Sequence, residues 1–484
     1  MPKFVMLWTD AAVWLLVASL LAYAVAVVRQ ANLSANWRKV FRDAPALSSA
    51  MLLCLCLLIT LADSVHYRLP LPSVAGTKGG AVAHDTRTRS LLDAALASLI
   101  ESREVTYSRP LAYVSFTKQT VTQAGRTERV APRLKHGGAH LADPASEWAG
   151  DVARRLGLGL LKGGVLAGAG AWLLFASLAR HRQSSLKEAA SSVWRHEGEV
   201  PWRAALWTWL VLCLLMSTVA SLASGYHVLG TDTTGNDVLY QSLKSIRTAF
   251  VIGSLATVAT LPLAVVLGIM AGYFGGWVDE VIQYLYTVLS SVPNVLLIAA
   301  CVLMVQVFLD KHPDLFETAV ERADLKLFLL CTVLGLTGWA GLCRLLRGET
   351  LKLRELDYVQ AAQAFGVSHP RIMLRHIFPN VAHLMLIVTV LEFSSLILYE
   401  AVLSYVGVGV DPSMNSFGGM INLARKEMSR EPVVWWSFAA AFGFMVTVVL
   451  AANLFADGVR DAFDPRARAF RPRLAIRPSA PRLP

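Results

Sequence analysis

The stretch Leu351–Asn380, LKLRELDYVQAAQAFGVSHPRIMLRHIFPN, is a polar island between two long apolar segments. Four apolar side chains in its first half recur at helical spacing, namely Leu356, Val359, Ala362 and Phe365. This spacing predicts a short amphipathic helix over residues 354–365. Gly366 follows where that helix should end, because glycine adopts a positive φ without steric cost.

The second half of the stretch predicts another short helix. Ser368 followed by Pro370 is typical of a helix cap and first turn, since proline lacks only a donor that the first turn leaves unpaired. Pro379 is expected to end this helix. Two short helices that carry the small side chains of Ala361 and Ala362 predict a protruding element that fits into a groove of another protein. The alternative is an ordinary cytoplasmic loop.

The composition indicates a polytopic membrane protein. Of the 484 residues, 55% are hydrophobic and only 16% are charged, with a mean hydropathy of +0.49. The formal net charge is +11, which could indicate nucleic-acid binding. The basic residues are spread over loops between apolar segments. The tendency of cytoplasmic loops to carry Lys and Arg therefore explains them better than nucleic-acid binding does, and no nucleic-acid partner is expected.

Several apolar segments are long enough to cross a bilayer core of roughly 30 Å. They comprise residues 11–28, 45–62, 156–178, 204–223, 250–274, 284–308, 327–346, 380–408 and 434–456. The first is interpreted as an anchor, with a cleaved signal peptide as the alternative. Within 284–308, Pro293 is expected to kink the helix.

These spans divide the chain into six predicted regions. From the N-terminus they are the N-terminal transmembrane helices (1–62), an extracytoplasmic domain (63–154), a further transmembrane hairpin (155–224), an interfacial segment (225–249), the main transmembrane domain (250–460) and a disordered cytoplasmic tail (461–484). The alternating pattern at 112–117 and a possible turn at Ala124–Gly125 predict that the extracytoplasmic domain is partly β. Basic loops at 29–42, 180–203 and 460–473 place the C-terminus and the Gln360 loop inside and the N-terminus outside.

The interfacial segment opens with a cluster of Asp, Asn and Thr residues around LGTDTTGND, from Leu229 to Asp237. A calcium loop is disfavoured there because no bidentate Glu closes a twelve-residue loop. Four apolar residues then recur at helical spacing: Leu239, Leu243, Ile246 and Phe250. With Lys244 and Arg247 off this stripe, the helix is expected to lie along the membrane surface before turning in.

The six cysteines lie in or beside apolar segments, without CxxC pairs or histidines at zinc-ligand spacing, so no metal site is expected. The chain also carries no GxxxxGK[ST], HExxH or GxSxG motif. We therefore expect that it is not an enzyme and binds no cofactor itself.

The Gln360 loop resembles a known family. Gln360-Ala361-Ala362, Gly366 and the run from His376 to Asn380 are similar to the EAA loop of binding-protein-dependent ABC importer permeases, in the dipeptide and oligopeptide branch and its microcin-C type. The sequence departs at Gln360, where the family usually has Glu, and at Phe378, where it usually has Leu. LGTDxxGxD, AGYFGGWVD from Ala271 and RDAFDPR from Arg460 extend the resemblance in order over residues 225–469.

The resemblance implies an all-α fold of the type I ABC importer transmembrane domain, here with extra N-terminal helices and a small extracytoplasmic α+β insert. It implies that the Gln360 loop docks on an ATPase subunit through Tyr358, Gln360, Ala361, Ala362, Gly366, Arg371, His376 and Pro379. The signature loop would comprise Gly230, Thr231, Asp232, Gly235 and Asp237. Compared with the Glu that is usual in the family, Gln360 has no charge but nearly the same size. Docking that depends on the shape of the loop is therefore still expected.

The implied function is the permease subunit of an importer in the bacterial inner membrane. Two ATPase subunits that use the ATP, a second similar permease and an extracytoplasmic solute-binding protein would be its partners. Glu392 and Glu400 lie within an apolar span and are candidates for the translocation path, with an interfacial position as the alternative for Glu400. The sequence does not identify the transported solute. The alternative function is a membrane scaffold or sensor that works through its extracytoplasmic domain.

Overall fold

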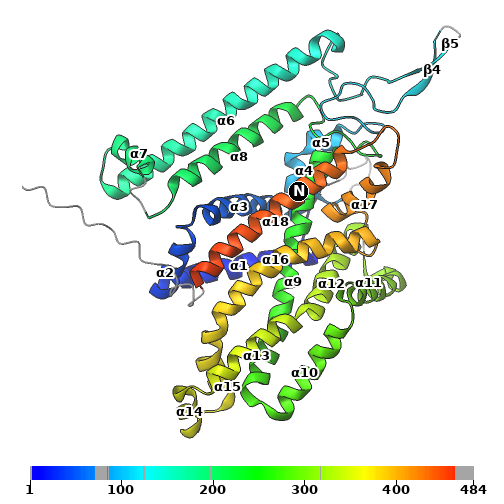
Figure 1. The fold of residues 1–484 in the computed structure, drawn as a ribbon. Coiled ribbons are helices and arrows are strands. Elements are labelled where there is room, and N and C mark those ends of the chain that lie inside the picture. Colours follow the sequence, from blue (N-terminus) through cyan, green and yellow to red (C-terminus); the bar gives the residue numbers. More distant parts are fainter. Residues whose placement is uncertain are drawn as a thin grey trace, which may run out of the picture.

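The computed structural model describes residues 3–70, 84–85, 87–123, 126–195, 199–316 and 318–463, and it is built almost entirely from helices (Figure 1). Among these residues, eight helices are long and apolar enough to cross a membrane, or nine if one bent pair counts as a single span. The predicted turn at Ala124–Gly125 and all but the first three residues of the predicted tail 461–484 lie outside the described residues.

The N-terminal half contains the short strands and the helices that precede the central bundle. The strands are β1 (Lys3–Val5), β2 (His66–Arg68), β3 (Arg89–Ser90), β4 (Gln119–Gln123) and β5 (Arg126–Val130). The helices are α1 (Trp8–Arg29), α2 (Ala31–Val40), α3 (Ala44–Asp63), α4 (Leu91–Ala95), α5 (Ala97–Glu101), α6 (Pro144–Arg182), α7 (Leu186–Trp194) and α8 (Trp202–Ala223). β1, β2 and β3 form one antiparallel sheet, and β4 and β5 form a hairpin.

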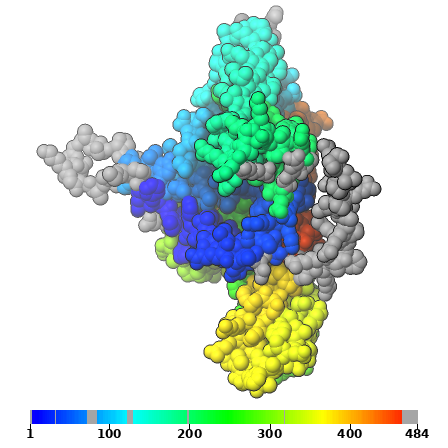
Figure 2. Space-filling view, turned by 90° about the vertical axis from the view of Figure 1, so that its left-hand side faces the viewer, coloured from blue at the N-terminus to red at the C-terminus, as the bar shows by residue number. Residues whose placement is uncertain are grey.

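The C-terminal half contains α9 (Val238–Phe274), α10 (Gly276–Ser291), α11 (Asn294–Lys311), α12 (Ala319–Gly338), α13 (Ala340–Arg354), α14 (Asp357–Ala364), α15 (His369–Ile372), α16 (Phe378–Val406), α17 (Phe417–Glu427) and α18 (Trp436–Phe463). α9 is the central helix, and α3, α12, α13, α16 and α18 all pack against it. Figure 2 shows the yellow part of the chain, which includes α14 and α15, protruding from the body.

The predicted spans at 11–28, 45–62, 156–178 and 204–223 lie within α1, α3, α6 and α8. The span predicted at 327–346 runs across a 41° bend between α12 and α13. The pairing of β1 with β2 places the N-terminus on the same side as the domain after α3, in agreement with the predicted topology. That domain is partly β, as predicted, with strands β2 to β5, but the alternating segment 112–117 itself forms only isolated bridges at Val114 and Ser115.

The surface helix predicted before Phe250 is also wrong, since α9 continues without a break from Val238 to Phe274. Arg247, which the sequence pattern placed on an exposed face, is only 4% exposed. Its guanidinium lies 2.7 Å from Asp10 of α1 and 3.6 Å from Asp324 of α12, and it donates a hydrogen bond to Thr9. A buried charge is tolerated when it is paired, so these partners, distant in sequence, explain the burial.

Lys244 is paired in the same way, one turn before Arg247. Its ammonium lies 3.0 Å from Asp63 of α3 and 2.8 Å from Asp93 of α4. Together the two cations of α9 connect the N-terminal helices and the extracytoplasmic domain to the central bundle.

Two prolines act differently from their predicted roles. Pro293 separates two helices instead of kinking one, because α10 ends at Ser291 and the residue before the proline, Val292, is extended. Pro379 does not end the second helix of the loop. A π-helical turn at Met373–Ile377 leads directly into α16, where Pro379 lies in the first turn and needs no donor.

The hairpin of α6 and α8 lies beside the bundle (Figure 1). A β-carbon at Gly159 would lie 2.6 Å from Cα of Thr218, and one at Gly163 would lie 2.8 Å from Cα of Leu214. Glycine at these positions therefore lets the two helix backbones approach closely.

Candidate functional site

The Gln360 loop is held at the end of the bundle farthest from the extracytoplasmic domain (Figure 1). α14 ends at Ala364, and Gly366 has a φ of +74°. The amide of Gly366 donates to the carbonyl of Gln363, and the amide of Val367 donates to that of Ala362. This left-handed turn confirms that Gly366 ends the helix and turns the chain into α15.

Three apolar side chains fix the loop to the bundle. Val359, Ile372 and Ile377 are fully buried in a cluster that also contains residues of α9, α10 and α13. Burying a side chain of this size contributes about 1.5–3 kcal/mol each. The loop is therefore packed as part of the bundle and does not hang from it.

Tyr273, near the end of α9, joins both short helices by hydrogen bonds. Its hydroxyl lies 2.8 Å from Nδ1 of His369 in α15 and accepts a hydrogen bond of 3.1 Å from Nε2 of Gln363 in α14. Close by, the guanidinium of Arg347 in α13 donates two hydrogen bonds to Asp279 in α10, at 2.6 and 2.7 Å. A displacement of the loop would therefore be transmitted to α9 directly.

The loop exposes several large apolar side chains among its polar ones, and this set is called its apolar face. Phe365 is 87% exposed and Leu374 is 69% exposed, and Leu356 and Tyr358 are each 43% exposed. The sequence pattern placed Phe365 and Leu356 on the buried stripe, which is wrong for both, because α14 runs only from Asp357 to Ala364 and leaves each just beyond an end. Large apolar residues within a polar island were the signal that could have identified this surface.

The other predicted coupling residues surround this apolar face. Gln360, Ala361 and Gly366 are exposed, as are Arg371 and Pro379, whereas Ala362 is half-buried against the core. Gln360 donates from Nε2 to the carbonyl of Glu355 at 3.3 Å. The predicted residues thus lie on one protruding element, with small side chains beside Phe365.

Tyr358 and His376 form a second contact between the two halves of the loop. Their ring centroids are 6.2 Å apart, and the hydroxyl of Tyr358 accepts a hydrogen bond of 3.2 Å from Nδ2 of Asn380 at the start of α16. This contact joins α14 to α16 in the way that Tyr273 joins α14 and α15 to α9.

The signature loop lies at the opposite end of α9. Gly230 and Gly235 have φ angles of +74° and +77°, and a β-carbon at Gly235 would lie 1.9 Å from the carbonyl oxygen of Glu104. Asp237 caps α9 by accepting hydrogen bonds from the amides of Leu239 and Tyr240 at 2.8 and 3.1 Å. The loop is thus shaped to start α9 and to pack against the extracytoplasmic domain.

The remaining signature residues also have structural partners. Thr231 accepts a 2.7 Å hydrogen bond from the amide of Ser108, and Asp232 accepts from the amides of Thr234 and Asn236. No group of three or more His, Cys, Asp or Glu side chains that could hold a metal ion occurs among the described residues.

A buried histidine connects the same loop to the extracytoplasmic domain. Nδ1 of His227 lies 2.7 Å from Asp237, and Nε2 lies 3.6 Å from Glu104. Burial alone would lower the pKa of His227, but the two carboxylates raise it to about 9. Burial would raise the pKa of Glu104, whereas His227 and the amides of residues 135–137 lower it to about 2.

The two predicted path residues have different surroundings. Glu400 is buried in protein, where it accepts a 2.6 Å hydrogen bond from Ser404 and lies against Gly418 of α17, so it does not lie at an exposed surface. Glu392 is exposed halfway along α16, beside Thr257, Thr260 and Thr389 of a small cleft. Of the two glutamates, only Glu392 has an exposed side chain, and it lies in this cleft halfway along α16.

A cavity of about 680 Å³ opens at the extracytoplasmic end, and the sequence pattern did not predict it. Residues of the signature loop, α11, α12 and the connection between α16 and α17 line it, including Asp232, Gln306, Lys326 and Asp411. Lys326 and Asp411 face each other across 3.7 Å. The volume of this cavity lies within the range of small-molecule binding pockets.

The sequence is similar to known transport proteins. Residues 264–469 match the family model described as binding-protein-dependent transport system inner membrane component. The chain is 33% identical over 245 residues to the oligopeptide transport system permease protein OppC of Mycobacterium tuberculosis, covering 51% of this chain and 78% of the relative. It is 30% identical over 254 residues to OppC of Escherichia coli K12, covering 52% and 77%.

Among solved structures, an inward-facing conformation of the MetNI methionine ABC transporter aligns with 47% of this chain and 96% of its own chain. Its sequence identity is 15% and its TM-score is 0.33. The sequence similarity covers about half of this chain.

Proposed function

Because this chain belongs to the family of binding-protein-dependent transport system inner membrane components, we propose that it forms the membrane path for peptides in an ATP-driven importer. It is a multi-pass permease of the bacterial inner membrane. Its curated relatives are oligopeptide permeases, and this supports peptides as the solute class.

The observation that carries the proposal is the Gln360 loop, which is rigidly packed yet presents an apolar outer face. Phe365 and Leu374 are large and exposed, while Val359 and Ile372 are buried beneath them. Exposed apolar clusters of this kind mark protein–protein contact sites. In this proposal an ATPase subunit binds the face around Ala361 and Phe365.

Movement of the ATPase would then reach the membrane through α9. The Tyr273 hydroxyl connects α9 to α14 and α15, and the Arg347–Asp279 pair connects α13 to α10. The loop would therefore act as a lever on α9, and the neighbouring α13–α10 pair would link the motion to α10. Nucleotide can drive the change only if it binds the two states of the transporter with different affinity.

The proposed assembly contains two ATPase subunits that use ATP, a second permease of the same family and an extracytoplasmic binding protein. The sequence carries no phosphate-binding GxxxxGK[ST] loop, so ATP hydrolysis is assigned to the partner. The 680 Å³ cavity would receive the solute from the binding protein, and Glu392 would face the path at mid-membrane.

Transport by the reconstituted complex tests this proposal. The complex purified from its native host would be placed in proteoliposomes, and uptake of a labelled oligopeptide would be measured with ATP, with a non-hydrolysable analogue and without nucleotide. Uptake that requires both ATP and the binding protein is expected, and Glu392→Gln should slow uptake if this carboxylate lines the path. A chain that purifies without an ATPase would instead favour the scaffold or sensor alternative.

A further inference from the structure

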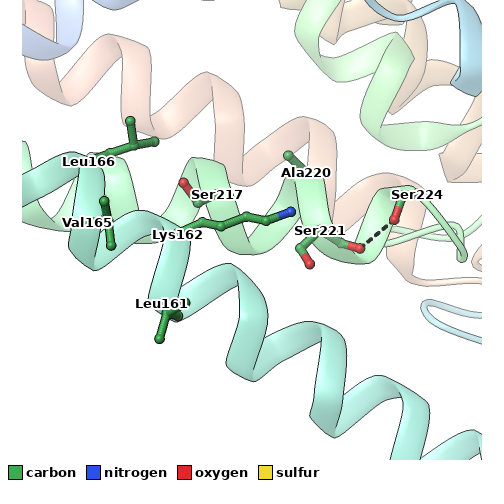
Figure 3. A pocket seen from close by; sticks show the side chains of 8 residues that line it. All are labelled: Leu161, Lys162, Val165, Leu166, Ser217, Ala220, Ser221 and Ser224. Carbon is green, nitrogen blue, oxygen red and sulfur yellow. Dashed lines mark hydrogen bonds between the residues drawn. The ribbon is translucent and has the colours of Figure 1, made fainter.

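A groove of about 540 Å³ lies between α6 and α8, outside the part of the chain that matches the permease family (Figure 3). α6 contributes Leu161, Lys162, Val165 and Leu166, and α8 contributes Ser217, Ala220, Ser221 and Ser224. The two helices approach each other closely at Gly159 and Gly163, which are near the lining residues in the sequence. The groove is therefore a built feature of the packing between the helices.

Lys162 is an uncompensated cation within a membrane-spanning helix. It is exposed, and no hydrogen bond or ion pair to it occurs among the described residues. In Figure 3 its side chain runs along α8, with the amine toward Ala220 and Ser221. Lys162 lies seven residues after Arg155, which is about 10 Å along the helix axis, and its amine is directed toward the end of α8 at Ser224. This is the arrangement of a lysine that reaches from the hydrocarbon toward the headgroup level.

One end of the groove carries a cluster of ion pairs. Arg155 donates to Asp151 at 2.7 Å and to Ser224 at 2.7 Å, and Arg154 donates to the same carboxylate at 2.6 Å. Asp151 thus pairs with two guanidinium groups, and Lys162 adds a further cation about two turns beyond Arg155. Basic side chains near a membrane surface attract anionic lipid headgroups, and Lys162 is exposed to them.

The other wall of the groove is apolar and open. Leu161 and Val165 are each 66% exposed, and Leu166 is 55% exposed. α6 packs against α8 and the short α7 at the edge of the molecule, so this wall faces outward from the bundle. The pattern is a cation beside exposed apolar side chains that can pack against part of an acyl chain.

We propose that this groove binds an anionic phospholipid, with the phosphate at Lys162 and one acyl chain along Leu161, Val165 and Leu166. A lipid headgroup and free phosphate would both offer a phosphate group to Lys162. The apolar wall beside Lys162 favours the lipid. The proposal is independent of the transport function, because α6 and α8 precede the region that matches the permease family.

Native mass spectrometry of the full chain in mild detergent tests the proposal. Phosphatidylglycerol and phosphatidylcholine with identical acyl chains would be titrated onto the wild type, Lys162→Ala and Lys162→Arg. One cationic contact near a membrane surface changes affinity by about fivefold, so Lys162→Ala should weaken phosphatidylglycerol binding by at least that factor. Lys162→Arg should retain the binding, and phosphatidylcholine should bind more weakly than phosphatidylglycerol.

Two further variants separate the charge from the groove. Lys187→Ala removes an exposed lysine from α7 and should leave binding unchanged. Val165→Trp keeps Lys162 but fills the apolar wall, and it should also weaken phosphatidylglycerol binding. Equal binding by wild type and Lys162→Ala would overturn the proposal, as would displacement of the lipid by millimolar inorganic phosphate. A photocrosslinker at Leu161 that captures a partner's helix in the assembled complex, and no lipid, would also overturn it.

Discussion

The hydroxyl of Tyr273, at the end of the central helix α9, lies 2.8 Å from Nδ1 of His369 in the loop that projects from the bundle. Because the same oxygen accepts a hydrogen bond from Gln363, its own proton is available for His369. One phenol therefore holds both short helices of the loop to α9.

Replacing Tyr273 by Phe should weaken coupling. The substitution removes two hydrogen bonds, each worth about 0.5–1.5 kcal/mol, while the ring keeps its packing. We expect peptide uptake to fall several-fold relative to ATP hydrolysis in proteoliposomes, with unchanged membrane insertion. Tyr284→Phe, on an exposed side chain of α10, is the matched control. An unchanged ratio of uptake to hydrolysis in Tyr273→Phe would show that this contact does not transmit motion.

A bulky side chain on the outer face of the loop should uncouple transport. Ala361 is exposed and Gly366 has open space around it, so a Trp at either position can fold but would obstruct a docked subunit. At Gly366 the positive φ adds strain of roughly 1–2 kcal/mol. Uptake should drop by at least tenfold in Ala361→Trp and Gly366→Trp, and Lys187→Trp on α7 should behave as wild type. Normal transport by Gly366→Trp would refute the coupling assignment.

The buried Arg247 should be essential for stability. Removing one member of a buried ion pair costs about 3–5 kcal/mol, so Arg247→Gln should lower the free energy of unfolding in mixed micelles by roughly that amount. Arg322→Gln breaks an exposed pair with Asp310 and should cost about 1 kcal/mol or less. In a double-mutant cycle, Asp10→Asn and Arg247→Gln should be less than additive. Strict additivity would show that Asp10 and Arg247 do not interact.

The His227 contact predicts a pH dependence of stability. The folded-state pKa is raised to about 9 from an ordinary value of 6.5. The stabilisation is therefore complete below pH 6.5 and is lost as the pH rises to about 9, amounting to on the order of 3 kcal/mol. The melting temperature should fall across this window, and His227→Gln should flatten the dependence. His312→Gln is the control, and a slope that persists in His227→Gln would contradict the assignment.

Much of the fold was predictable because membrane spans are long apolar runs, and the turn at Gly366 was predictable because glycine signals a left-handed backbone. The buried position of Arg247 was not predictable, since its partners Asp10 and Asp324 are far away in the sequence. A periodicity argument sees only neighbours on one helix, so it placed this charge at the surface.

The candidate site was predicted in part for similar reasons. The loop and its exposed Ala361 followed from local sequence, whereas the exposure of Phe365 depends on where α14 ends. The role of Tyr273 depends on a contact between residues 96 positions apart. Pro379 does not end the helix because a π-helical turn precedes it and places it in the first turn of α16. The helix-breaking tendency of proline alone does not predict this turn.

The most direct test of the central claim is photocrosslinking from the loop. A benzoylphenylalanine placed at Phe365 in the native host should, on irradiation, crosslink to an ATPase subunit that is identified by the peptide carrying its phosphate-binding loop. The same probe at Trp435, which is exposed at the extracytoplasmic end, should give no such product. An ATPase crosslinked from Phe365 alone is the predicted result. An ATPase absent from the Phe365 products of an actively transporting complex would contradict the claim that this loop is the coupling element.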